Sequence, residues 1–196
     1  MDADSKKQKQ QKKKGKGERS SGRWAVQVFF IAVFLSAALS FASDQALNGA
    51  GLAVAFAVLL AFILLGIVFD IIGVAVTAAD EKPFHSMAAR KTPGAREALG
   101  LIRKADKVSS FCNDVVGDIC GIITGSTVAV IVTQLQAALG LPAMAATAVS
   151  LLVTALASGL TIGGKALGKS FAIARSTAVL QLVGRFLHLF SRKNKR

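Results

Sequence analysis

The chain has 196 residues, 53% of them hydrophobic, and its 24 Lys and Arg outnumber its 11 Asp and Glu. This composition excludes an ordinary soluble domain, because a fold of this size has no second layer that could bury so much apolar surface. A large basic excess is typical either of nucleic-acid binders or of membrane proteins with cytoplasmic cations, and the apolar runs favour the membrane class.

The first segment, residues 1–23, holds nine Lys and Arg and shows no apolar periodicity. It predicts a disordered cytoplasmic arm. Each cation near anionic headgroups contributes about 1 kcal/mol of attraction, so we expect the arm to contact the bilayer surface. We do not expect nucleic-acid binding, because no aromatic residue interleaves the lysines.

Four apolar stretches follow, at 24–43, 51–79, about 115–137 and 142–163. Each reaches the ~20 residues that a helix needs to cross a hydrocarbon core about 30 Å thick. They predict an all-α integral membrane bundle with four crossing helices. The stretch 24–43 is longer than a signal-peptide core, so we expect an uncleaved extra transmembrane helix; cleavage after SFAS (40–43) is the alternative.

The distribution of cations predicts the topology. Nine lie in 1–23, seven in 80–110 and eight in 164–196, which accounts for all 24. The connectors 44–50 and 138–141 have none. By the positive-inside rule, both termini lie in the cytoplasm and the protein spans the plasma (bacterial cytoplasmic) membrane.

Two amphipathic segments lie outside the four stretches. Residues 83–108 are interrupted by Pro93-Gly94 and predict a cytoplasmic helical hairpin. Residues 170–190 carry apolar residues at helical spacing and predict a C-terminal juxtamembrane helix in the interface plane. A basic tail, 191–196, follows.

Three carboxylates interrupt the apolar pattern. Asp70 lies inside the second stretch, and Asp114 and Asp118 lie at the expected start of the third helix. Ionisable groups in membrane helices usually face a bundle interior or water. With Thr77 and Asn113 they predict a cation pathway. Interfacial carboxylates stabilised by a helix N-terminus and by nearby lysines are the alternative.

Small residues recur at four-residue intervals and predict close helix packing, within a bundle or in a homodimer. The predicted packing positions are Gly117, Gly121, Gly125, Gly159 and Gly163, with a further pair at Gly164 and Gly168.

Catalytic motifs are missing from the sequence: it has no GxSxG, HExxH or Walker loop, so we do not expect an enzyme. Cys112 and Cys120 are eight residues apart on one expected helix, roughly 12 Å, which exceeds disulfide reach. We expect both to be buried as small apolar side chains.

Three short stretches, FDIIGVAVTAAD (69–80), FCNDVVGD (111–118) and GKALGKSFA (164–172), carry a family resemblance. Together with the order of segments 51–80, 83–108, 110–137, 142–163 and 170–190, they resemble the transmembrane domain of the cyclin-M/CorC divalent-metal transporters. The membrane domain would then span 51–190, without the cytoplasmic regulatory domains. The positions shared with the family's motifs are Phe69, Ala75, Asn113, Gly164, Lys169 and Ala172.

The resemblance implies a site for a dehydrated divalent ion, with Asp70, Asn113 and Asp118 as the metal ligands of this divergent chain. Asp70 stands at a family serine and Gly73 at a glutamate. Lys165 replaces a second glutamate, and Gly168 replaces a proline. Lys165 is expected to modulate the site, either by repelling the ion or by pairing with an aspartate and closing it.

The sequence therefore predicts a divergent cation-transporting or cation-binding membrane protein, with Mg²⁺ or Na⁺ as the candidate ions and a second copy of the chain as partner. The alternative is a structural or regulatory membrane protein that docks a protein partner through its basic cytoplasmic segments.

Overall fold

A computed structural model describes residues 3–140 and 142–193, with side chains for 24–140 and 142–190. As predicted, the chain is all-α, and no strand occurs in these ranges. It divides into two units, residues 1–39 and 40–196.

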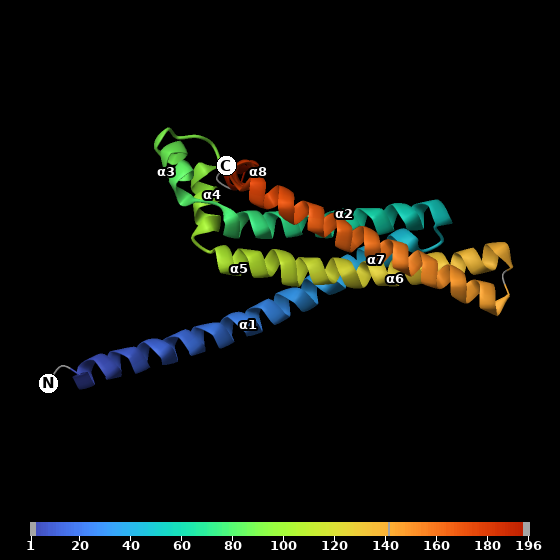
Figure 1. Ribbon diagram of the computed structural model, residues 1–196, viewed down its shortest axis with the longest axis horizontal. Helices are drawn as coiled ribbons and strands as arrows, with labels where there is room; N and C mark the ends of the chain where they lie inside the picture. Colours follow the sequence, from blue (N-terminus) through green and yellow to red (C-terminus); the bar gives the residue numbers. More distant parts are fainter. Residues whose placement is uncertain (1–2, 141, 194–196) are drawn as a thin grey trace. The chain divides into compact units, whose positions relative to one another are not determined.

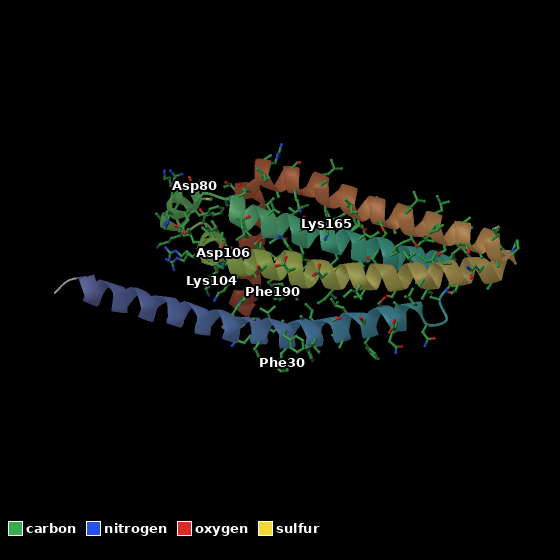
Figure 2. The ribbon with its side chains drawn as sticks, turned by 60° about the horizontal axis from the view of Figure 1, so that its bottom comes forward. Phe30, Asp80, Lys104, Asp106, Lys165 and Phe190 are labelled. Atoms are coloured by element: carbon green, nitrogen blue, oxygen red, sulfur yellow. The ribbon has the colours of Figure 1, made fainter. Side chains whose placement is uncertain are left out.

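The first unit consists of most of α1 (Ala3–Leu47). Trp24–Leu47 is long and apolar enough to cross a membrane, and Phe30 projects from it as a largely exposed side chain (Figure 2). The helix extends back to Ala3, which differs from the disordered arm predicted for residues 1–23. Lys and Gln are good helix formers, and extending an existing helix avoids the cost of nucleation.

Three long helices run side by side in the second unit (Figure 1): α2 (Leu52–Ala78), α6 (Gly117–Leu139) and α7 (Ala143–Ala174). With Trp24–Leu47 they confirm the four predicted helices that can cross a membrane by length and apolarity. α6 ends at Gly140, whose φ of 57° stops the helix, and Pro142 precedes α7. Residues 140–142 alone separate these two helices.

Three shorter helices gather at the opposite end of the second unit: α3 (Glu81–Ala89), α4 (Ala95–Ile102) and α8 (Ser176–Lys193). The Asp80 carboxylate caps α3 by accepting from the Lys82 N–H at 3.1 Å. Gly94, at φ +86°, makes the turn that α4 needs to begin. Figure 2 shows Asp80, Lys104 and Asp106 together at this end of the unit.

The third long helix begins earlier than predicted. α5 (Ala105–Ser110), η1 (Phe111–Val116) and α6 are joined by residues with right-handed helical dihedrals, so the helix runs from Ala105 to Leu139. η1 is a π-turn, in which the Gly117 N–H donates to the Cys112 carbonyl. Asp114 and Asp118 therefore lie well inside a helix. The prediction that they lie at a helix start, stabilised by its N-terminal dipole, was wrong.

Two apolar clusters stabilise the second unit. One lies toward the α6–α7 turn and includes Leu59, Ile63 and Ile131. The other lies toward the short helices and includes Val76, Phe84 and Leu180. Along α2 the buried members of the two clusters end at Ile63 and resume at Ala75, and the layer between them holds the polar groups discussed next.

Candidate functional site

The face of α2 between the two apolar clusters packs closely against η1 and α6. A Cβ on Gly66 would lie 3.3 Å from the Cys120 Cβ, and a Cβ on Gly73 would lie 2.8 Å from the Asn113 Cγ. These two contacts show that α2 and the third long helix run antiparallel. Asp70 lies between Gly66 and Gly73, at the level of Val116 and Gly117.

Two buried oxygen acceptors on this contact have no hydrogen-bond partner within the described part of the chain. Asp70 is 4% exposed and its Oδ2 atom is unpaired. The Asn113 amide donates from Nδ2 to the Ser109 Oγ at 3.2 Å, while its Oδ1 is buried against Gly73 without a donor. Unpaired buried acceptors are costly. Ser43 Oγ and Gln134 Oε1 are also buried without a partner among the described residues, but Asp70 is the one ionisable residue of the four.

Lys165 on α7 adds a cation to the same layer. α7 packs in parallel on α2 where Gly164 contacts Ile67 and Gly168 contacts Ile71; a Cβ on Gly168 would lie 2.9 Å from the Ile71 Cγ1. The Lys165 side chain is half-buried and turned into the bundle (Figure 2). Its Nζ lies 3.5 Å from the position of a Cβ on Gly117. The ammonium group is thus at the level of Asp70.

The other predicted pathway residues are exposed. Asp114 and Asp118 face outward from the third long helix, within about one helical turn of the level of Asp70 by the α2 register. Thr77 is also exposed, and its hydroxyl donates to the Val74 carbonyl at 2.9 Å. The structure therefore places Asp70, Asn113 and Lys165 at nearby levels of the bundle and leaves the other three on the surface, and no ion pair joins Lys165 to Asp70 among the described residues.

The glycines predicted to pack helices fall into two groups. Gly117 is buried beside Lys165, whereas a Cβ on Gly121, Gly125, Gly159 or Gly163 would meet nothing within 4 Å. The predicted pair Gly164 and Gly168 does pack tightly, on Ile67 and Ile71 of α2, and Gly66 and Gly73 make two further close contacts in the long helices. Sequence reasoning did not single out Gly66 or Ser109, although Gly66 and Gly73 at a seven-residue spacing share a helix face.

The site can hold a cation or a hydrogen-bond donor. Carboxylate and amide oxygens are the ligands that Mg²⁺ and Ca²⁺ prefer, and Mg²⁺ usually keeps several of its waters. In the part of the chain that the structure describes, no three His, Cys, Asp or Glu side chains come together. Asp70 and Asn113 would therefore supply two ligands of a largely hydrated ion.

A second polar contact fixes α8 to α4, away from this layer. Gly184 packs directly on the Gly94 backbone, and a Cβ on Gly184 would lie 3.2 Å from the Ala98 Cβ. The His188 Nδ1 lies 2.7 Å from the Glu97 Oε1. Partial burial raises the pKa of Glu97, but the hydrogen bonds and the nearby His188 outweigh this effect and leave the pKa below its ordinary value of 4.5.

Comparisons of the chain with protein-family models, curated proteins and solved structures found no match. The resemblance to the cyclin-M/CorC transporters therefore stays a prediction from the sequence.

Proposed function

We propose that the protein is a four-span membrane protein with both termini in the cytoplasm. The four long apolar helices support the spans. The proposed orientation in the membrane is supported by two observations. The connectors 44–50 and 138–141 contain no cations, and Lys and Arg of α3, α4 and α5 are exposed at the other end of the helices. This orientation puts the short helices and α8 against the inner leaflet, where anionic headgroups attract cations.

Within this membrane domain we propose a cation-binding site for transport of an Mg²⁺-like or Na⁺ ion. The observation that carries the proposal is the pair of buried, unpaired acceptors, Asp70 Oδ2 and Asn113 Oδ1. Asp70 lies eight residues from the end of α2, or about 12 Å, so its carboxylate is in the inner part of the hydrocarbon core. A bare carboxylate is expensive there, and a bound cation would satisfy the unpaired oxygen of Asp70.

Lys165 regulates the occupancy of this site in our proposal. Its ammonium lies at the level of Asp70 and competes electrostatically with an arriving cation. Asp114 and Asp118, on the surface of the third long helix, would attract the ion. Thr77 follows Asp70 by seven residues, which is about two helical turns along the same side of α2 toward the short helices.

The test is Mg²⁺ and Na⁺ uptake into proteoliposomes with Asp70→Asn. We expect at least about a tenfold loss of flux, because losing even an outer-shell group typically weakens metal binding 10- to 100-fold. Asp106→Asn is the matched control, since this exposed carboxylate lies on the same long helix as Asn113 but outside the layer. Lys165→Gln should increase cation binding. Unchanged flux in Asp70→Asn would exclude the site.

A second candidate function is a non-transporting protein that docks a partner at the cytoplasmic face. It is favoured by the position of Lys165, which can pair with Asp70 and close the layer, and by the exposed cations of α3 to α5. This candidate predicts no flux in the wild type, a gain of metal binding in Lys165→Glu, and a partner whose binding is lost on charge reversal of Arg90 and Lys91.

A further inference from the structure

The ammonium group of Lys165 has no counterion within the described part of the chain. It forms neither an ion pair nor a hydrogen bond there, although the side chain is half-buried and turned into the bundle (Figure 2). Its Nζ lies 3.5 Å from the position of a Cβ on Gly117, on the side of the third long helix that faces α7. Charged groups in membrane helices are costly unless they pair, and the fold supplies no partner for this cation.

Two carboxylates on the neighbouring helices leave the ammonium unpaired. Asp70 is buried on α2, and its Oδ2 atom has no partner among the described residues. Asp118 is exposed on the third long helix, one position after Gly117. Neither carboxylate forms an ion pair with Lys165 in the described ranges.

A groove of about 550 Å³ between α6 and α7 begins one helical turn from this ammonium, toward the connection between the two helices. Gly121 and Thr161 line the groove and lie four residues from Gly117 and Lys165, so each pair shares a helix face. A Cβ on Gly121 would meet nothing within 4 Å. The space beside Lys165 is therefore continuous with the groove.

Two hydroxyl groups in this groove are free to donate. Thr124 on α6 is 8% exposed, and neither its hydroxyl nor that of Ser158 on α7 forms a hydrogen bond with a described residue. The Thr161 hydroxyl, in contrast, donates to the Ala157 carbonyl at 2.7 Å. No charged residue lines the groove, so Lys165 at its end gives this region a positive charge.

We propose that Lys165 binds an anionic group at the end of this groove, with the Thr124 and Ser158 hydroxyls as further donors, directly or through water. Ammonium and hydroxyl groups are the donors that an anion requires. A few polar groups in a largely apolar lining are the usual form of a small-ligand pocket. Because no carboxylate lines the groove, nothing within it repels an anion.

A free anion such as chloride and the phosphate of an inner-leaflet lipid carry the same chemistry, and the experiment below separates these two sources. Both would offset the unpaired charge of Lys165. The opposite flank of α7 offers no such site, because the groove of about 350 Å³ between α2 and α7 is lined only by apolar side chains.

The consequence for cation binding rests on the proposed function. An anion beside Lys165 neutralises the ammonium and removes its repulsion of a cation that arrives at Asp70. Coupling between two binding sites is reciprocal, so a cation at Asp70 also strengthens anion binding. The anion therefore acts as an activator of the cation site.

The experiment measures the melting temperature of the full chain in phosphatidylcholine nanodiscs, in sodium chloride and in sodium gluconate of equal ionic strength. If the anion is chloride, the melting temperature should rise by about 2 °C or more in sodium chloride. A second arm, in gluconate throughout, compares nanodiscs with and without phosphatidylglycerol. A rise of the same size in that arm identifies a lipid phosphate as the anion.

Lys165→Gln should lose the rise in whichever arm the wild type shows it, with unchanged helix content by circular dichroism. Lys169→Gln is the matched control and should keep the rise, because this exposed lysine lies one turn farther along α7. Asp118→Asn should enlarge the rise, because it removes a negative charge near the site. No rise in either arm, or an equal rise in Lys165→Gln and the wild type, would overturn the proposal.

Asp70→Asn separates this inference from the proposed function, because it removes a cation ligand and leaves Lys165 in place. The anion effect should persist in this variant. If the anion effect is present and the wild type shows no cation flux, the cation site is refuted and the anion site stands. If the wild type carries cations but shows no anion effect in either arm, the anion site alone is refuted.

Discussion

Gly73 determines how closely η1 can approach α2. Its missing side chain leaves the space that the Asn113 amide occupies, and even a methyl group there would collide with Oδ1. The cost of a glycine in the middle of a helix is roughly 0.5–1 kcal/mol relative to alanine. The close contact at Asn113 therefore explains why glycine, and not a better helix former, stands at this position.

We predict that Gly73→Ala destabilises the protein by about 1–3 kcal/mol, the usual cost of overpacking a close contact. This sign is diagnostic, because helix propensity alone would make the substitution stabilising. Thermal unfolding in detergent measures it. Asn113→Ala in the same chain should restore most of the loss, because it removes the atoms that collide.

Gly121→Ala and Gly159→Ala are the matched controls for this prediction. Neither position has a heavy atom within 4 Å of the added Cβ in this chain. Both substitutions should leave the melting temperature of the monomer unchanged or slightly raised. A loss as large as that of Gly73→Ala would mean that the effect is not caused by the contact with Asn113.

At the scale of the elements, the contact between α4 and α8 depends on pH through Glu97. The pKa of this carboxyl is lowered in the folded protein, so its stabilising contribution is complete above about 4.5 and disappears as the pH falls through the lower folded value. The charged or titratable groups that lower the pKa of Glu97 are His188 on α8 and Arg96 on α4.

We therefore expect hydrogen exchange of α8 to be independent of Glu97 between pH 7 and pH 5 and to increase below about pH 4.5. The pair is partly exposed, so its contribution should be under about 1 kcal/mol. Glu97→Gln is the control, and its α8 exchange should lack this acid-dependent step. A step of equal size in the variant would assign the pH effect to another group.

The sequence predicted the long helices well, because about 20 consecutive apolar residues allow few other structures. It did not predict the π-turn at 111–116, because one extra residue in a helical turn does not change the hydropathy pattern of the sequence. The positions of Asp114 and Asp118 within the helix were missed because the helix begins at Ala105, in a charged stretch that hydropathy does not assign to the membrane helix.

The candidate site was only partly predictable for a related reason. The spacing of Gly159 and Gly163 equals that of Gly164 and Gly168, yet only the latter pair packs on α2. A spacing shows that small residues share a face, but not which face meets a neighbour. The sequence grouped Asp70 and Asn113 in one predicted site across two helices, while the contact of Gly73 with Asn113 required coordinates.

For the whole molecule, the proposed topology makes a direct prediction about accessibility. In sealed cells, Asn48→Cys in the connector between α1 and α2 should react with a membrane-impermeant maleimide from outside. Ser86→Cys on α3 should react only after permeabilisation, because it lies among the exposed cations of the cytoplasmic end. If Ser86→Cys reacted from outside and Asn48→Cys only after permeabilisation, the proposed topology would be wrong and the basic helices would lie outside.

The π-turn has a consequence for how this chain can vary. A π-turn contains one residue more than an α-turn needs, so deleting one codon between Phe111 and Val116 would still leave an unbroken helix. Each residue of a π-turn rotates the chain by less than the 100° of an α-helix, so the widened turn absorbs its extra residue. After the deletion, Ser109 and Cys120 would therefore keep nearly the same faces relative to one another. A single in-frame deletion would act mainly on the stretch that holds Asn113 and would preserve the helix contacts on either side of it.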